Sequence, residues 1–298
     1  YTPYQAEASQ GTLQTIFEFQ SLICRLTGLD VANASVYDGG TAAADAILMA
    51  VAQTRRSKVL ISRGLHPQIR EVIATYLAGS SIQVEEIPLD PKTGQTCLPE
   101  VGADVAAVLV QNPNFLGIIE DGPSLCQKAH SSGALAIVEV SDPVCLALLR
   151  SPGEYGADIC CGDAQSLGNP VAYGGPYVGF LACTNKLMRR IPGRLVGLTE
   201  DAQGRRGFCL TLQAREQHIR REKASSNICS NQALCALATT IYLSLLGPVG
   251  LKKAAVSSLQ SSAYLKEQVA KLEGFSLPLS GSTYNEFVLR CPQGTAAE

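Results

Sequence analysis

A glycine-rich turn opens an alanine-rich run at Asp38-Gly39-Gly40-Thr41. Free N–H groups at a helix N-terminus, glycines that permit close approach and a threonine hydroxyl together form a cradle for a phosphate group. The same residues also suit an ordinary capped helix after a tight turn. The motif alone does not separate these two interpretations. Its spacing is neither GxGxxG nor GxxxxGK[ST], so a nucleotide-binding fold is not favoured.

Further polar residues follow apolar runs of the sequence. His66 comes after "LISRGL", Asn112 and Asn114 lie in "VLVQNPNFLG", and Asp142 lies in "ALAIVEVSDP". At the carboxyl ends of parallel strands, an imidazole can stack on an aromatic cofactor. A carboxylate there can hold the pyridinium nitrogen of pyridoxal phosphate protonated. Each residue alone also suits a surface loop or a turn opened by Asn-Pro or Asp-Pro, but together they outline a crevice.

The stretch "GADICCGDAQSLGNPVAYGGPYVGF" is typical of a buried strand, a polar turn, a glycine-rich bend and a second strand. If the crevice belongs to a pyridoxal-phosphate enzyme, this turn is where the lysine that holds the cofactor should lie. The turn consists of residues 165–168, Gln-Ser-Leu-Gly, and the nearest lysines are Lys128 and Lys186. Neither lysine lies at the required position, so we expect no covalent attachment of the cofactor to this chain.

A charged run, "REQHIRREKASSN", offers Arg215, Arg220 and Arg221 as an anion site. Because Glu216 and Glu222 are interleaved with the arginines, a solvated or subunit-facing helix is favoured over that site. The sequence has no GxSxG elbow, and metal-ligand spacing is absent. We therefore expect no metal and no nucleophilic hydrolysis.

Composition narrows the class of protein. The chain has 298 residues, 46% of them hydrophobic, and a formal net charge of -2. This balance gives no basic field for nucleic acid or an anionic membrane, and no stretch approaches the roughly 20 apolar residues of a membrane span. The 11 cysteines are odd in number and never spaced CxxC, and Cys160-Cys161 sits in an apolar run. We interpret them as small buried hydrophobes in a reducing cytosol rather than disulfide or metal ligands.

The elements that must position these residues alternate along the chain. Short apolar strands are predicted at 58–62, 81–88, 105–110, 134–140, 157–161 and 177–183, with helical stretches at 13–26, 38–56, 66–78 and 122–132. This pattern is typical of an α/β fold with a mostly parallel sheet covered by helices on both faces. Beyond it, we predict a strand or hairpin arm at 205–212 and helices at 213–224 and 231–247.

A domain boundary is predicted near Gly247-Pro248. Residues 1–247 then form a large domain, and residues 248–298 begin a small C-terminal domain with a helix at 250–274 and a strand at 285–291. Because the chain begins at Tyr1 without Met and ends inside this second domain, we expect it to be a fragment, with an N-terminal arm missing and the small domain truncated.

Two long stretches carry a resemblance to a known family. The segment from "YTPYQAEASQ" to "VYDGGTAAADAILMA" and the segment "TLQAREQHIRREKASSNICSNQALCALATTIYLSLLGP" resemble the glycine dehydrogenase (decarboxylating) P-protein family, in particular subunit 1 of its two-subunit form. The resemblance covers essentially the whole chain. It implies the aspartate-aminotransferase-like fold, which is fold type I of pyridoxal-phosphate enzymes.

The resemblance also implies a division of labour. In this family the cofactor lysine belongs to subunit 2, and the equivalent turn of subunit 1 has a Gln-Ser-Leu-Gly type of sequence, here beginning at Gln165. The paired subunits decarboxylate glycine, release CO2 and pass the aminomethyl group to the lipoyl arm of the H-protein. We therefore expect pyridoxal phosphate on the partner subunit, and in this chain a vestigial pocket formed by Gly39, Gly40, Thr41, His66, Asn112, Asp142 and Gln165.

We also expect this chain to contribute residues to the active site of the partner subunit. The candidates for an active-site wall across the subunit interface are Tyr1, Thr2, Tyr4 and Gln5; an equally weighted alternative is that the tyrosines only pack at that interface. A purely structural or regulatory paralogue is one alternative. An independent desulfurase or lyase is another, but it would need a lysine directly after "ADICC", which the chain lacks. A cytoplasmic location is expected.

Overall fold

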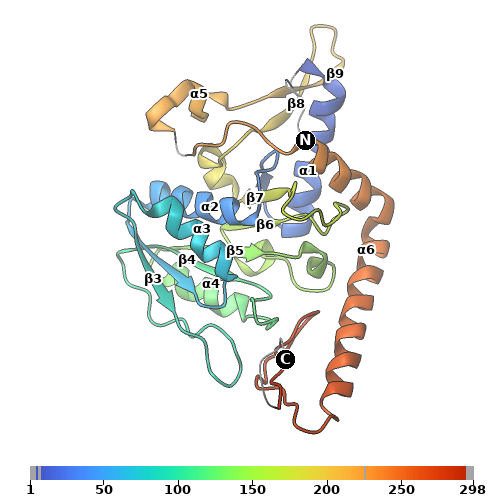
Figure 1. Ribbon diagram of the computed structural model, residues 1–298. Coiled ribbons are helices and arrows are strands. Elements are labelled where there is room, and N and C mark those ends of the chain that lie inside the picture. Colours follow the sequence, from blue (N-terminus) through green and yellow to red (C-terminus); the bar gives the residue numbers. More distant parts are fainter. Residues whose placement is uncertain (1–4, 6–7, 225, 293–298) are drawn as a thin grey trace.

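Strands and helices alternate along the first two thirds of the chain in the computed structural model (Figure 1). The structure describes residues 5, 8–224 and 226–292. The strands are β1 (Val31–Ala32), β2 (Lys58–Ser62), β3 (Gln83–Ile87), β4 (Val105–Gln111), β5 (Leu135–Val140), β6 (Ile159–Asp163), β7 (Gly179–Cys183), β8 (Val196–Glu200) and β9 (Arg206–Leu210). The α-helices are α1 (Gln10–Thr27), α2 (Gly39–Thr54), α3 (Pro67–Leu77), α4 (Gly122–Ser131), α5 (Gln217–Arg220) and α6 (Ala233–Val269).

Seven strands form one sheet in the order β1-β7-β6-β5-β4-β2-β3. Strands β2, β3, β4, β5 and β6 pair in parallel with one another, whereas β7 runs antiparallel to both β6 and β1. All seven residues of β4 are buried, as expected for a strand covered on both faces. The prediction of a mostly parallel sheet covered by helices is confirmed.

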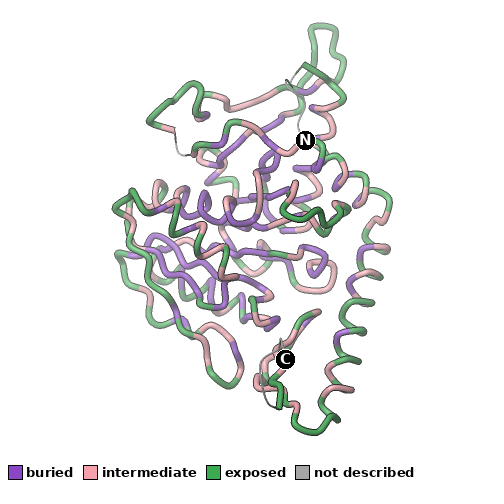
Figure 2. The backbone as a smooth tube through the Cα atoms, viewed as in Figure 1, coloured by how far each residue is buried: buried purple, intermediate pink, exposed green. Residues whose placement is uncertain are grey.

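The sheet divides the apolar interior into two layers. Because successive side chains of a strand point to opposite faces, Leu60, Val108 and Val138 pack with residues of α1, α4 and α6 on one face. Their neighbours in sequence, such as Val59 and Leu109, pack with α2 and α3 on the other. Figure 2 shows the strands as the buried centre of the protein, with the C-terminal half of α6 largely exposed.

Helix α2 lies against the centre of the sheet because its side chains are small. Ala42, Ala43, Ala44 and Ala46 are completely buried, and α2 contacts β4, β5, β6 and β7. This helix begins at Gly39, one residue beyond its N-cap Asp38. The close packing therefore brings the start of α2 to the ends of β5 and β6.

Two glutamines of α1 join that helix to the β8–β9 hairpin. The side chain of Gln20 accepts a hydrogen bond from the Val196 backbone N–H at 2.9 Å and donates one to the Val196 carbonyl at 3.0 Å. Gln10 makes the same pair of bonds with Phe208, at 2.8 and 2.9 Å. Gln20 is buried and Gln10 is exposed. Each amide thus extends the hairpin's hydrogen bonding in the way another strand would.

The charged run at 213–224 is not one helix, and the prediction there is wrong. It forms two 3-10 turns, η5 (Gln213–Arg215) and η6 (Arg221–Lys223), on either side of the four-residue α5. Leu212 and Arg221 both have φ of 54°. This left-handed backbone region is rare for residues other than glycine and interrupts a right-handed helix.

The predicted helices at 231–247 and 250–274 join into α6, with non-helical backbone at Gly247 (φ 56°, ψ -175°). The domain boundary placed there stays a prediction. By length and composition alone α6 could cross a membrane, contrary to the sequence expectation, but the break divides it and a third of its apolar window is buried inside the protein.

The strand predicted at 285–291 is wrong, since that segment makes only an isolated bridge between Ser276 and Arg290. Without a neighbouring strand to pair with, an apolar run gains no ladder of hydrogen bonds.

Replacing Gln20 by leucine should lower the free energy of unfolding by about 2 to 4 kcal/mol, because the buried N–H and carbonyl of Val196 would each lose their partner. Gln10→Leu is the matched control. Water can replace its exposed side chain, so it should cost less than about 1 kcal/mol. Urea unfolding followed by circular dichroism measures both, and equal losses would contradict the explanation.

Candidate functional site

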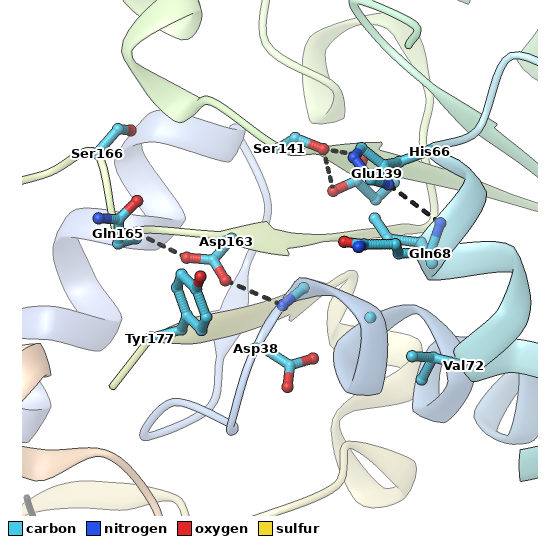
Figure 3. Close-up of a pocket in the computed structure, with 13 residues that line it drawn as sticks. Asp38, His66, Gln68, Val72, Glu139, Ser141, Asp163, Gln165, Ser166 and Tyr177 are labelled. Carbon is cyan, nitrogen blue, oxygen red and sulfur yellow. Dashed lines mark hydrogen bonds between the residues drawn. The ribbon is translucent and has the colours of Figure 1, made fainter. Parts of the chain in front are cut away.

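A pocket of about 410 Å³ opens where the carboxyl ends of β5 and β6 meet the first turns of α2 and α3 (Figure 3). Ligands of open α/β sheets bind at this edge of the sheet. The pocket is lined by Asp38, Gly39, Gly40, His66, Gln68, Ile69, Val72, Glu139, Ser141, Asp163, Gln165, Ser166 and Tyr177. Of the residues expected from the sequence, Gly39, Gly40, His66 and Gln165 are among them.

The start of α2 is closed by a capping box. The Asp38 carboxylate accepts a hydrogen bond from the Thr41 backbone N–H at 2.8 Å. In return the Thr41 hydroxyl accepts one from the Asp38 N–H at 3.3 Å. Thr41 itself is not part of the pocket lining. The motif is therefore a capped helix start, as one sequence interpretation held. Its two glycines also line a pocket, which is the position that the other interpretation required.

Asp163 is the last residue of β6 and faces the start of α2 (Figure 3). One carboxylate oxygen accepts from the Gln165 N–H at 2.8 Å, and the other accepts from the Gly39 N–H at 3.3 Å. Burial raises the pKa of Asp163 to about 6, although these N–H donors oppose the shift. Sequence reasoning missed this residue; the available signal was a carboxylate directly before the polar turn.

Glu139 is a second carboxyl group that sequence reasoning missed. It lies inside β5, is fully buried, and both of its oxygens contact the Ser141 hydroxyl, at 2.9 and 3.0 Å. Burial is the main cause that raises the pKa of Glu139 to about 8; the Ser141 hydroxyl opposes the shift and the nearby charge of Asp163 adds to it. Glu139 is therefore mainly protonated at neutral pH. The signal was a single acidic residue in the otherwise apolar run 134–140.

His66 lies at the mouth of the pocket as the N-cap of α3. Its Nδ1 accepts a hydrogen bond from the Gln68 N–H at 3.2 Å. Its ring packs edge-on against Phe115, with ring centroids 4.6 Å apart. The histidine thus follows its strand as expected, and its contacts within the chain are those of a helix cap and an aromatic pair.

Asn112, Asn114 and Asp142 lie outside the pocket lining. Asn112 accepts from the Glu120 N–H at 3.0 Å, and Asn114 donates to the Glu120 carboxylate at 2.8 Å. Asp142 accepts from the Ser166 hydroxyl at 2.8 Å and from the Asn285 amide at 3.2 Å. These side chains join loops to one another by hydrogen bonds. The sequence predicted that polar residues from three strand ends would line one crevice; of these residues, only His66 lines the pocket.

Gln165 lines the pocket from the turn that follows β6. Its side-chain amide donates to the Asn169 carbonyl at 3.1 Å, which turns it toward its own loop. Of the proposed interface wall, Tyr1, Thr2 and Tyr4 lie outside the described residues. Gln5 is exposed, and its carbonyl accepts a hydrogen bond from the Ala8 N–H at 3.1 Å.

The structure also shows where the residues of the alternative anion site and the cysteines lie. Arg215 donates to the Ile191 carbonyl, whereas Arg220 and Arg221 are exposed. Cys160 and Cys161 are buried, and each of the 11 cysteines, all of which lie in the described part of the chain, has a free thiol. Within residues 5, 8–224 and 226–292, no group of three or more His, Cys, Asp or Glu side chains is arranged to hold a metal ion.

The pocket residues do not fit pyridoxal phosphate. Gln165 stands in the turn where a lysine would be required, and no lysine or arginine is present among the described residues that line the pocket. The N–H groups of Gly39 and Thr41, which would face a phosphate group, already donate to carboxylates. An anion would enter a pocket that contains three acidic side chains.

Comparisons with known proteins agree along the whole chain. A family model described as glycine cleavage system P-protein matches residues 1–298. Probable glycine dehydrogenase (decarboxylating) subunit 1 of Desulforamulus reducens is 57% identical over 97% of this chain. The protein of the same name from Moorella thermoacetica is 56% identical, also over 97%. The chain spans 65% and 66% of the length of these two relatives.

Solved structures give the same result. A crystal structure of glycine decarboxylase (P-protein) of the glycine cleavage system, in inhibitor-bound form, superposes with a TM-score of 0.94 at 48% identity. That match covers 98% of this chain and 66% of the other. An aspartate aminotransferase from Thermus thermophilus superposes with a TM-score of 0.67 at 16% identity, over 99% of this chain and 78% of the other. This second likeness confirms the predicted aspartate-aminotransferase-like fold.

Glu139→Gln should become more stable relative to the unchanged protein as the pH rises from 5 to 8. The pKa of Glu139 is raised from 4.5 to about 8 in the folded state, so the unchanged chain loses stability as the unfolded state releases a proton that the folded state retains. Glutamine does not titrate, so the variant avoids a loss on the order of 3 kcal/mol.

Urea unfolding at both pH values measures this difference. The control is Glu273→Gln, whose side chain is exposed near the end of α6; its effect should be the same at pH 5 and pH 8. A Glu139→Gln effect that does not change with pH would contradict the burial argument.

Proposed function

The chain belongs to the glycine cleavage system P-protein family, and from this premise we propose that it is the lysine-free subunit of a heteromeric glycine dehydrogenase (decarboxylating). The observation that carries the proposal is Gln165: it stands in the turn after β6, where the family resemblance requires the cofactor lysine of a complete active site. The relatives named subunit 1 support a second, homologous subunit as the partner.

In this proposal pyridoxal phosphate is bound by the lysine-bearing partner subunit. The cofactor supplies an electron sink when CO2 leaves glycine. The aminomethyl group then passes to the lipoyl arm of the H-protein. The described residues that line the pocket of this chain include no lysine or arginine, which supports that assignment.

This chain would complete the partner's active site. We assign that role to the stretch Tyr1, Thr2, Tyr4 and Gln5, since a residue that meets a partner must be exposed in the separate chain, and Gln5 is exposed. The free cysteines, many of them buried, are compatible with a reducing cytoplasm, where we place the protein.

Two other functions are less well supported. An independent pyridoxal-phosphate desulfurase or lyase requires a lysine after β6, and the turn has Gln165 instead. A purely structural or regulatory paralogue shares the fold and the family, and it differs from our proposal in one respect: changes at residues 1–5 would leave catalysis intact.

The full-length protein should catalyse exchange between bicarbonate and the carboxyl carbon of glycine only when it is combined with its lysine-bearing partner and H-protein. Borohydride reduction followed by peptide mapping should find the cofactor adduct on the partner alone. An adduct on this chain, or exchange activity without the partner, would overturn the proposal.

Gln5→Ala in the assembled complex should lower kcat by about tenfold, which corresponds to about 1.4 kcal/mol of transition-state stabilisation, without changing assembly measured by size-exclusion chromatography. Tyr4→Phe provides a second variant at the same wall. Gln203→Ala is the matched control, since Gln203 is an exposed glutamine of the β8–β9 hairpin. Unchanged kcat in both Gln5→Ala and Tyr4→Phe would favour the structural paralogue.

A further inference from the structure

We propose that Asp163 and Asp38 act as built-in anions at the N-terminus of α2, so that the pocket of this chain rejects phosphate-bearing ligands. The proposal goes beyond the proposed function. It predicts that the pocket would stay closed to pyridoxal phosphate even if a lysine were supplied at position 165. It also concerns this chain alone and holds whether or not the assembled protein decarboxylates glycine.

The N–H donors at the start of α2 already have acceptors within the chain. A phosphate group binds a helix N-terminus through the free N–H groups of the first turn. In α2 the Gly39 N–H donates to Asp163 at 3.3 Å, and the Thr41 N–H donates to Asp38 at 2.8 Å. Two of the first three N–H groups of the helix thus already have carboxylate acceptors, one from its own cap and one from β6.

The space beside Gly39 and Gly40 is limited. A methyl group added to Gly40 would lie 3.3 Å from a carboxylate oxygen of Asp38 and 3.4 Å from the Val72 side chain. A methyl group added to Gly39 would lie 3.2 Å from the backbone of residues 162 and 163. At these distances a neighbouring atom would have to move by a few tenths of an ångström to admit a methyl group beside either glycine. The space beside the two glycine Cα atoms is therefore closely packed by the chain's own atoms.

The charge of the pocket residues also opposes the binding of phosphate. The pocket lining contains Asp38, Glu139 and Asp163, and no lysine or arginine among its described residues. With its pKa near 6, Asp163 is mainly ionised at neutral pH. A phosphate dianion would displace that carboxylate from the Gly39 N–H and then lie beside it. Like charges at such a separation repel each other in a partly buried site.

Asp163 also links the two halves of the vestigial site. Its second oxygen accepts from the Gln165 N–H at 2.8 Å, so the same side chain holds both the start of α2 and the turn that bears Gln165 (Figure 3). Two separate barriers therefore keep the cofactor out: the turn lacks a lysine, and the N–H donors of the phosphate cradle already bind carboxylates. Removing one barrier leaves the other in place.

The test measures binding of inorganic phosphate and of pyridoxal phosphate to the full-length chain by equilibrium dialysis at pH 7.5. The variant is Asp38→Ser with Asp163→Ala: serine remains a good N-cap without the charge, and alanine frees the Gly39 N–H. This variant should bind both ligands at least about tenfold more tightly than the unchanged chain. Asp163→Asn, which keeps the size of the side chain, is measured beside it and should bind at least about threefold more tightly.

The matched control is Asp121→Ser with Asp201→Ala. It also removes two negative charges, but away from the pocket. Asp121 is the N-cap of α4 and accepts a hydrogen bond from the Ser124 N–H, and Asp201 lies on the exposed β8–β9 hairpin. Its phosphate binding should equal that of the unchanged chain. The proposal is overturned if the control gains as much affinity as the pocket variants, or if the unchanged chain already binds phosphate as tightly as they do.

A second measurement separates the two barriers. Gln165→Lys alone should give no borohydride-trapped adduct with pyridoxal phosphate on the peptide that carries position 165. Gln165→Lys combined with Asp38→Ser and Asp163→Ala should give one. An adduct of equal yield in the single variant would show that the cradle was open and would overturn the proposal, whatever the exchange activity of the assembled complex.

Discussion

The Asp163 carboxylate is the interaction on which the candidate site depends. It accepts hydrogen bonds from the Gly39 N–H at the start of α2 and from the Gln165 N–H in the turn after β6. The start of α2 is thereby joined to the end of β6 and to the turn directly after it, although Gly39 and Asp163 are 124 residues apart in the sequence. Because the side chain is partly buried, each of these bonds replaces a bond to water that folding has removed, and losing one would leave a donor unsatisfied.

The sheet makes that meeting possible. Strands β5 and β6 are parallel neighbours, with Val140 paired with Gly162, so their carboxyl ends lie side by side. A side chain at Gly162 would overlap the Val140 carbonyl, and one at Gly179 would overlap the Asp38 carbonyl. Only glycine permits such close approach of backbones. The helix start, the two strand ends and the returning strand β7 are therefore as near to one another as their main chains allow.

The fold was largely predictable because it rests on patterns that extend over many residues. Runs such as 105–110 and 134–140 are apolar throughout, as strands covered on both faces must be, and the alanines of α2 predict a helix packed closely on its neighbours. The errors arose where single residues decide. Positive φ at Arg221 breaks the helix predicted at 213–224, and a second positive φ at Leu212 directly precedes it; neither residue type signals that backbone conformation.

The site was less predictable for a related reason. The position of Asp142 just beyond an apolar run suggested a pocket residue. The strand end, however, directs Glu139 and Ser141 into the pocket, while Asp142 reaches across to Ser166 and Asn285. A shift of one position along a strand or its continuation moves a side chain to the opposite face. Sequence spacing locates the edge of the sheet at which a site lies, but not the face toward which each side chain points.

The carboxylates also supply the helix start with acceptors that a bound phosphate group would otherwise provide. A ligand that binds only the folded state stabilises it by mass action, and a protein that loses its ligand loses that stabilisation. In this chain the helix donors that a phosphate group would satisfy have permanent partners in Asp38 and Asp163. The cost is the burial of acidic groups, visible in the raised pKa values of Asp163 and Glu139. Since Glu139 remains mainly protonated at neutral pH, that cost is smaller than it would be if both buried carboxyl groups were charged.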